Sequence, residues 1–268
     1  HGGFDEEGVR RIRRSQRSMF TTLESQIPIK NRKTFNIASL KPLVIVDTNI
    51  LIQAFKDELA RKGSSDGLGY LEWSMERAFQ WALRKHGDSG SIKPYIPNSV
   101  MSEFKNRTKN AKTCKRLFDG EYQDPVLWSS IKDNDIEQIQ ADIIGIFNRV
   151  DLNFEQSQEI KDKMNGFLAS HEDIFEQIDE NKRLRRDDEP SRYVINGRAI
   201  YPEYGDREIM IDAASLATYT SRHTSKLRDV GSIVIATRDS DFRLVSRALE
   251  EEYGFGVVSD AQQLNSRI

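Results

Sequence analysis

The sequence is short of the residues that covalent crosslinks and zinc sites need. It contains one cysteine, Cys114, which cannot close a disulfide within the chain, and four histidines that show no ligand spacing. No apolar run approaches the roughly 18 residues needed to cross a membrane, and no early segment resembles a secretion signal. We therefore expect an intracellular protein, with the cytoplasm favoured, that has neither a membrane span nor a disulfide framework.

An excess of charge of one sign is also absent. Lys and Arg total 40 and Asp and Glu total 42, which gives a net charge of -2 and leaves the class of partner undetermined. The cations are nevertheless concentrated in three clusters, at residues 10–17, 105–116 and 182–186. Concentrated cations can hold a phosphate backbone with one surface of a nearly neutral protein. For any single cluster, the alternative is a solvated helix face.

Apolar runs alternate with helical patterns over most of the chain. Short runs at 43–46, 92–96, 232–236 and 255–258 predict strands, and Pro94 places the second of them near a sheet edge. This alternation is typical of an α/β fold with a mostly parallel sheet. The predicted helices cover residues 49–62, 71–85, a segment capped by Asn98 or Ser99 that continues through Glu103 into the second basic cluster, 131–150, 154–184, 205–220 and 242–252.

The chain is long enough for one large domain with an insertion. Residues 1–36 predict a basic amphipathic helix followed by a linker, and residues 37–268 form the predicted main domain. From about 117 to 203 the residue pattern changes to that of polar helices with moderate apolar stripes, and we interpret this segment as a helical insertion. Trp73 and Trp81 lie eight residues apart on one predicted helix, so core packing is the expectation for both.

A carboxylate stands where the first apolar strand ends. Asp47 follows Leu43–Val46, and a second apolar run begins at Ile50. A strand covered on both faces should not carry a charge without a reason, and in open α/β sheets ligands bind at the carboxyl ends of the strands. Thr48 and Asn49 could cap the following helix and orient the carboxylate, or Asp47 itself could be only a helix cap.

Three more acids lie at the boundaries of predicted elements: Glu103 early in a helix, Asp206 at a helix start and Asp239 after a late strand. Parallel topology can bring strand ends and helix starts together. Clustered carboxylates raise one another's pKa unless a cation lies among them. A set of oxygen ligands without cysteine or clustered histidine suits Mg²⁺ or Mn²⁺, and such ions hold phosphodiesters and activate water.

The order of these residues resembles that of the PIN-domain nucleases. Val-Asp-Thr-Asn-Ile-Leu-Ile at 46–52 and Asn-Ser-Val-Met-Ser-Glu-Phe at 98–104 resemble the first two acidic motifs of that family, and Ile-Ala-Thr-Arg-Asp-Ser-Asp-Phe at 235–242 resembles its late motif. For the third motif, Asp-Arg-Glu-Ile at 206–209 resembles larger members, whereas Asp-Ala-Ala at 212–214 could align with compact ones. The resemblance covers roughly 43–116 and 205–260, and excludes the N-terminal helix and the insertion.

The resemblance implies a PIN-like three-layer α/β/α fold and metal-dependent endonucleolytic cleavage, of single-stranded RNA in preference to DNA. It implies that Mg²⁺ or Mn²⁺ is held by Asp47, Glu103, Asp206 and Asp239, directly or through water, with Asp212 and Asp241 as alternates. Asn49 and Thr237 would orient these carboxylates. Geometry then suggests that the cations following Glu103 guide the nucleic acid, namely Lys105, Arg107, Lys109 and Lys112.

Other readings remain open at the level of the sequence. Taken singly, Glu103 can be a solvated helix acid, Asp206 a helix cap and Asp239 a turn residue. A domain with this pocket could be an inactive scaffold or a nucleic-acid binding module within a larger complex. A phosphotransferase of the haloacid-dehalogenase type would need a second aspartate two residues after Asp47, where the chain has Asn49. The insertion or the N-terminal helix could also contact a protein partner or a second copy of the chain.

Overall fold

The structure is a computed structural model that describes residues 40–63, 75–117, 131–150, 152, 154–171, 193–195, 198–200, 204–220 and 230–268. The described elements belong to one compact unit, Leu40–Ile268. The N-terminal helix and linker predicted at 1–36 lie outside the described residues, as do Trp73 and the basic cluster at 182–186.

Four parallel strands form the central sheet. They are β1 (Lys41–Val46), β2 (Lys93–Tyr95), β5 (Val230–Ala236) and β6 (Phe255–Val258), in the order β2-β1-β5-β6. Every neighbouring pair is parallel, which confirms the predicted α/β class with a parallel sheet. Residues 42–46 of β1 are all buried, as expected for a central strand covered on both faces. The strand that contains Pro94 lies at an edge, as predicted.

The strand order places a switch point between β1 and β5, from which the chain continues in opposite directions across the sheet. The chain passes from β1 to β2 on one side, whereas the other neighbour of β1 is β5, which comes much later in the sequence. Val46 pairs with Ala236 in the register of β1 and β5, so Asp47 and Thr237 follow the two strand ends side by side. The carboxyl ends of strands at such a switch point are where open α/β folds bind ligands.

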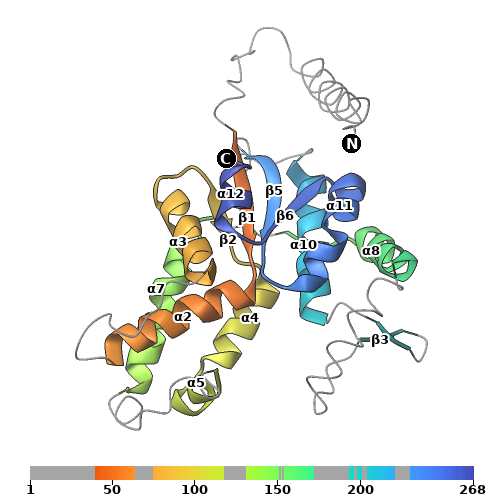
Figure 1. Ribbon diagram of the computed structural model, residues 1–268. Helices are drawn as coiled ribbons and strands as arrows, with labels where there is room; N and C mark the ends of the chain where they lie inside the picture. Colours follow the sequence, from red (N-terminus) through yellow and green to blue (C-terminus); the bar gives the residue numbers. More distant parts are fainter. Residues whose placement is uncertain are drawn as a thin grey trace, which may run out of the picture. The chain divides into compact units, whose positions relative to one another are not determined.

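Helices lie on both sides of this sheet, in agreement with three layers (Figure 1). On one side α10 packs on β5 and α11 on β6, and on the other α3 packs on β2. The core helices are α2 (Thr48–Gly63), α3 (Met75–Asp88), α4 (Asn98–Arg107), α5 (Ala111–Leu117), α10 (Tyr204–Thr220), α11 (Ser240–Tyr253) and α12 (Ala261–Asn265). None of the described helices is long and apolar enough to cross a membrane.

The segment at about 117–203 contains the expected helices and one unexpected hairpin. Helix α7 (Asp133–Phe147) packs on α2 and α3, and α8 (Gln158–Ser170) packs on α10. Two short antiparallel strands, β3 (Tyr193–Ile195) and β4 (Arg198–Ile200), follow. The sequence between them is Asn196-Gly197, a strong hairpin signal that the interpretation as helices and loop did not use.

One prediction around α4 is wrong in detail. The N-cap of α4 is Pro97, which makes no side-chain cap, instead of Asn98 or Ser99. The helix runs into the second basic cluster and ends at Arg107, with Thr108 as its C-cap and the Thr108 hydroxyl bonded to the carbonyl of Phe104 at 2.7 Å. The second basic cluster is therefore divided between α4 and α5, and does not lie along a single helix.

Trp81 also departs from its prediction of core packing. Its side chain is 55% exposed, and Lys85 Nζ lies over the ring at 5.1 Å from its centre. The apolar stripe of α3 buries Phe79, Ala82 and Leu83 instead. Because Trp81 lies next to this stripe and not on it, helical spacing from Trp73 was a poor guide to burial.

Candidate metal centre

Asp47 is buried at the switch point and is held by three donors. It follows β1 directly, and its backbone N–H extends the ladder to the carbonyl of Ala236 at 3.1 Å. One carboxylate oxygen accepts the Thr48 N–H at 2.5 Å. The other accepts Asn49 Nδ2 at 2.6 Å and Thr237 Oγ1 at 2.5 Å. With 4% exposure, this carboxylate is fixed before any ligand binds.

The environment of Asp47 disfavours its own negative charge. Burial raises the pKa of Asp47 to about 7, and the charges of Asp239 and Glu103 add to the rise. The hydrogen bonds from Thr237 and Thr48 act in the opposite direction but do not offset it. A cation among the three carboxylates would reverse the effect of the neighbouring charges.

Glu103 links α4 to the start of α2 and lies near the start of α10. Its Oε2 accepts the hydroxyl of Thr48 at 2.7 Å, and its Oε1 forms an ion pair with Arg107 Nη2 at 2.7 Å. A Cβ atom added at Gly205, in the first turn of α10, would lie 3.6 Å from Glu103 Oε2. The carboxylate of Glu103 therefore lies between the start of α2 and the start of α10.

Asp206, Asp239 and Asp241 form a second, close group of carboxylates. Among the residues that the structure describes, one carboxylate oxygen from each lies within 4.8 Å of those of the other two. Asp239 caps α11 by accepting the Asp241 N–H at 3.1 Å, and its own N–H donates to Thr237 Oγ1 at 3.0 Å. Asp241 is fully buried in the first turn of α11.

Asp239 joins the two sets of acids. Its charge acts on Asp47, and its carboxylate lies beside those of Asp206 and Asp241. In an octahedral Mg²⁺ shell, adjacent oxygen ligands are about 3 Å apart and opposite ones about 4.2 Å. Three carboxylate oxygens within 4.8 Å of one another could therefore share one ion by moving closer together or through an intervening water. Carboxylate oxygens alone, with no nitrogen or sulfur donor among them, fit a hard divalent cation such as Mg²⁺ or Mn²⁺.

The two candidates for the third acid occupy different surroundings. Asp206 lies in the first turn of α10 within the acidic trio. Asp212 lies farther along the same helix, where Gln156 Nε2 donates to it at 2.8 Å and to Glu208 at 3.0 Å. Burial and the charge of Glu208 raise the pKa of Asp212 to about 6. Asp212 thus contacts the segment before α8.

No protein-family model, curated protein or solved structure matches this chain. The chemical interpretation of the centre therefore depends on its own geometry.

Thr237 and Thr48 organise the acids through their hydroxyl groups. Thr237 Oγ1 donates to Asp47, accepts the Asp239 N–H, and lies 3.3 Å from Asn49 Nδ2. Thr237 and Asn49 therefore lie where the sequence placed them, next to the carboxylate at the end of β1. Thr48, by contrast, was expected only as a cap or an aid to Asp47. Its link to Glu103 depends on a partner 55 residues away, which local sequence does not reveal.

The predicted nucleic-acid contacts lie on the surface beyond Glu103. All four side chains are exposed, and Arg107 is engaged in the ion pair with Glu103. They belong to α4, its connection and α5: Lys105, Arg107, Lys109 and Lys112. The sequence interpretation did not include two further cations as candidate contacts. Arg238 lies within the late motif at 235–242, and Arg243 lies about one turn later.

Cys114 is buried, and burial raises the pKa of its thiol to about 12. A nearby negative charge, that of Asp133, adds to the rise. The thiol is therefore inert at neutral pH.

Proposed function

We propose that this protein is a Mg²⁺- or Mn²⁺-dependent endonuclease of PIN-like fold that cleaves phosphodiester bonds, with single-stranded RNA as the favoured substrate. The observation that carries the proposal is the convergence of acids from four elements at one switch point. Asp47 and Asp239 follow β1 and β5, and Glu103 and Asp206 come from early turns of α4 and α10. Asp241 is an accessory acid in this scheme.

The side chains have distinct parts in the proposed reaction. A bound divalent ion supplies positive charge to a phosphate oxygen and lowers the pKa of water. Asp47, Glu103, Asp206 and Asp239 would hold that ion, and Thr237 fixes the separation of Asp47 and Asp239 by bonding to both. Thr48 holds Glu103 in place through a hydrogen bond to its carboxylate. Such outer hydrogen bonds set both ligand orientation and metal affinity.

The proposed partners follow from the same arrangement. The exposed cations of α4 and α5 would attract the phosphate backbone toward the acids, although the ion pair with Glu103 reserves Arg107 for a positioning role. The parts of the chain that the resemblance does not cover, the insertion and the N-terminal helix, are the proposed contacts for a protein partner or a second copy of the chain.

The test is cleavage of a labelled single-stranded RNA oligonucleotide in Mg²⁺, in Mn²⁺ and in EDTA. Asp47→Asn and Asp239→Asn should each lower the metal-stimulated rate at least about a hundred-fold, because the lost ligand supplies several kcal/mol to the transition state. Asp162→Asn is the control, since this acid is exposed on α8 and, among the described residues, bonds to Gln158 of its own helix.

Three outcomes separate the hypotheses. Metal-dependent cleavage that both variants lose supports the nuclease. Unchanged cleavage by both variants would contradict the assignment of these acids to a nuclease site. Calorimetric binding of Mn²⁺ with no turnover of RNA or DNA by the wild type would favour the inactive scaffold or binding module.

A further inference from the structure

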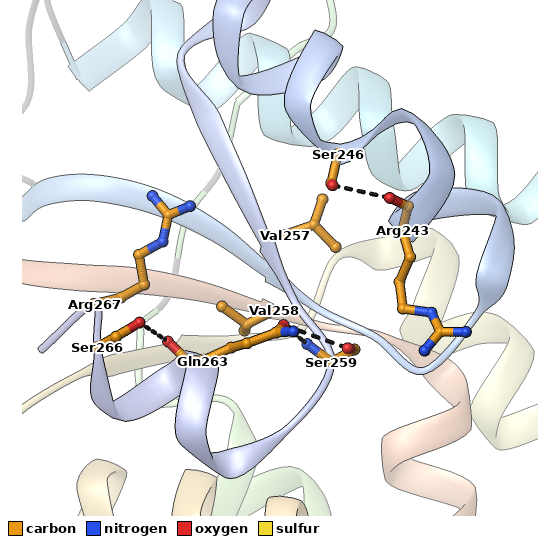
Figure 2. A pocket seen from close by; sticks show the side chains of 8 residues that line it. All are labelled: Arg243, Ser246, Val257, Val258, Ser259, Gln263, Ser266 and Arg267. Carbon is orange, nitrogen blue, oxygen red and sulfur yellow. Dashed lines mark hydrogen bonds between the residues drawn. The ribbon is translucent and has the colours of Figure 1, made fainter. Parts of the chain in front are cut away.

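A concave site lies near the acidic centre. It is a groove of about 270 Å³ between the first turns of α11, the end of β6 and α12 (Figure 2). The volume is below the roughly 300–1,000 Å³ of a typical small-molecule site, so the groove suits a group the size of one phosphate with part of its sugar. Its polar lining consists of Arg243, Ser246, Ser259, Gln263, Ser266 and Arg267.

The two arginines of this groove differ in their charge balance. Arg267 forms a two-point ion pair with Glu250, at 2.5 and 2.8 Å. Its guanidinium lies against the backbone at Gly256, where an added Cβ would be 3.0 Å from Arg267 Cζ. Arg267 therefore forms one wall of the groove, and its charge is balanced by Glu250. For Arg243, no carboxylate among the described residues lies within ion-pairing distance, so its charge is available to a ligand.

Arg243 also lies at the end of the groove that faces the acidic centre. Figure 2 shows it opposite Arg267, on the side where the faint orange ribbon of β1 passes into α2. Thr237, which bonds to both Asp47 and Asp239, donates its N–H to the carbonyl of Val258 at 3.0 Å, and Val258 lines the groove. The groove is therefore joined by a backbone hydrogen bond to the residue that orients the proposed metal ligands.

The remaining lining adds an amide donor without adding an acid. Gln263 Oε1 accepts the Ser259 N–H at 2.8 Å, which orients its amide and leaves the Nε2 hydrogens as donors. The hydroxyls of Ser246 and Ser266 donate to carbonyls at 2.9 and 2.7 Å, so they are not donors for a ligand in this arrangement. Asp260, next to Ser259 in the sequence, caps α12 by accepting the Gln263 N–H. The charge of Arg243 beside the Gln263 amide favours an anion in the groove.

We infer that this groove binds a backbone phosphate of the nucleic-acid strand, one or two nucleotides from the bond at the acidic centre, with Arg243 as the principal contact. This inference rests on the proposed function and extends it, because it gives the path of the strand across the protein. The strand runs from the acids, past Arg238, toward β6 and α12. Phosphate contacts of this kind set the register of a strand without reading its sequence.

The test compares Arg243→Gln with Arg247→Gln. Arg247 is the matched control, because it lies one turn farther along α11, its side chain is 91% exposed, and it pairs with Glu251 outside the groove. Binding of a labelled 12-nucleotide single-stranded RNA is measured by fluorescence anisotropy with Ca²⁺ in place of Mg²⁺. Arg243→Gln should weaken binding about five- to twenty-fold for every sequence and lower the salt slope by about 0.7, whereas Arg247→Gln should do neither.

A second arm distinguishes a strand from a free anion. Inorganic phosphate at millimolar concentration should compete weakly with the oligonucleotide for the wild type and not at all for Arg243→Gln. In cleavage assays, the same substitution should raise KM and leave kcat within about two-fold, since it acts on binding that is equal in the ground and transition states.

The results that overturn the inference are distinct from those that overturn the nuclease. Equal RNA affinity and salt slope for the two variants would exclude the groove, even if the wild type cleaves. Failure of the wild type to cleave in any metal would remove the nuclease, while the binding arm with Ca²⁺ would still report on the groove. Competition by inorganic phosphate without any effect of Arg243→Gln on RNA binding would reduce the groove to a free-anion site and overturn the inference as stated.

Discussion

At the scale of the residue, the account depends on a carboxylate that is costly to bury. Asp47 is surrounded by strand ends and by two further acids, and its pKa is raised from 3.8 to about 7. Nothing in the core of β1 requires a charge at this position. A residue that opposes stability and yet is held by three well-formed hydrogen bonds is typical of a functional site.

Asp47→Asn should stabilise the metal-free protein at alkaline pH. An acid whose pKa is raised on folding contributes stability below its unfolded pKa, near 4, and that contribution is lost as the pH rises through about 7. The gain of the variant over the wild type should therefore increase between pH 4 and 7 and reach on the order of 2–4 kcal/mol at pH 8. Thermal unfolding in EDTA at pH 5 and pH 8 measures it, and a pH-independent difference would contradict the burial argument.

The two acids of α10 provide a matched comparison. Asp206→Asn should lower Mn²⁺ affinity about ten- to a hundred-fold, because Asp206 belongs to the acidic trio. Asp212→Asn should leave Mn²⁺ affinity unchanged, since its carboxylate is bonded to Gln156. Isothermal titration calorimetry at pH 8 makes the measurement. Loss of Mn²⁺ binding in Asp212→Asn alone would assign the third acid to the motif at 212–214.

At the scale of the element, the ends of β1 and β5 act as one unit. Their register brings Asp47 beside Thr237, and one hydroxyl then bonds to the acid of one strand and to the backbone of Asp239 after the other. The position therefore needs a small side chain that both donates and accepts.

Thr237→Val tests this connection, with Thr237→Ser as the conservative control. Removing the hydroxyl deletes a hydrogen bond that lowers the pKa of Asp47, so that pKa should rise further. Metal affinity should fall about ten-fold or more, as for other residues that orient ligands. The pH dependence of Mn²⁺ binding reports both effects, because its midpoint should move to higher pH in Thr237→Val and stay in place in Thr237→Ser. Identical midpoints in both variants would remove Thr237 from the site.

Elements with strong local signals could be predicted from the sequence. The apolar runs gave the four strands of the sheet, and β6 matches its predicted bounds. The missed features depend on competition or on distant partners. The end of α4 at Thr108 has no strong local signal, and the groove is lined partly by Gln263, Ser266 and Arg267 from the five-residue helix α12 and the residues after it, a helix with no apolar periodicity of its own.

The acids themselves were found because each follows a strand or begins a helix, where a charge stands out. Their mutual distances could not be found, since these depend on the strand order β2-β1-β5-β6. Arg243 could not be singled out for the same reason: it is one of two arginines on α11, and only packing shows that it lines a groove.

At the scale of the whole molecule, the two helices of the predicted insertion pack on helices that lie on opposite sides of the sheet. Helix α7 packs on α2 and α3, and α8 packs on α10, the helix that carries Asp206. Gln156, just before α8, bonds to Glu208 and Asp212 at once and so joins the insertion to α10 by a part-buried contact.

Gln156→Ala should destabilise the domain by about 1–3 kcal/mol, because two carboxylates lose their donor in a part-buried site. The control Gln158→Ala removes an exposed bond to Asp162 within α8 and should change stability by less than about 0.5 kcal/mol. Urea unfolding at pH 7 measures both. Equal stability of the two variants would show that the insertion does not depend on this contact.

The most direct test of the account is to locate Mn²⁺ by anomalous diffraction in crystals of the protein soaked in MnCl₂. The account predicts an anomalous peak bounded by Asp47, Glu103, Asp206 and Asp239, lost in crystals of Asp239→Asn. A site at Asp212 and Glu208, or no peak among the four acids at saturating Mn²⁺, would contradict it.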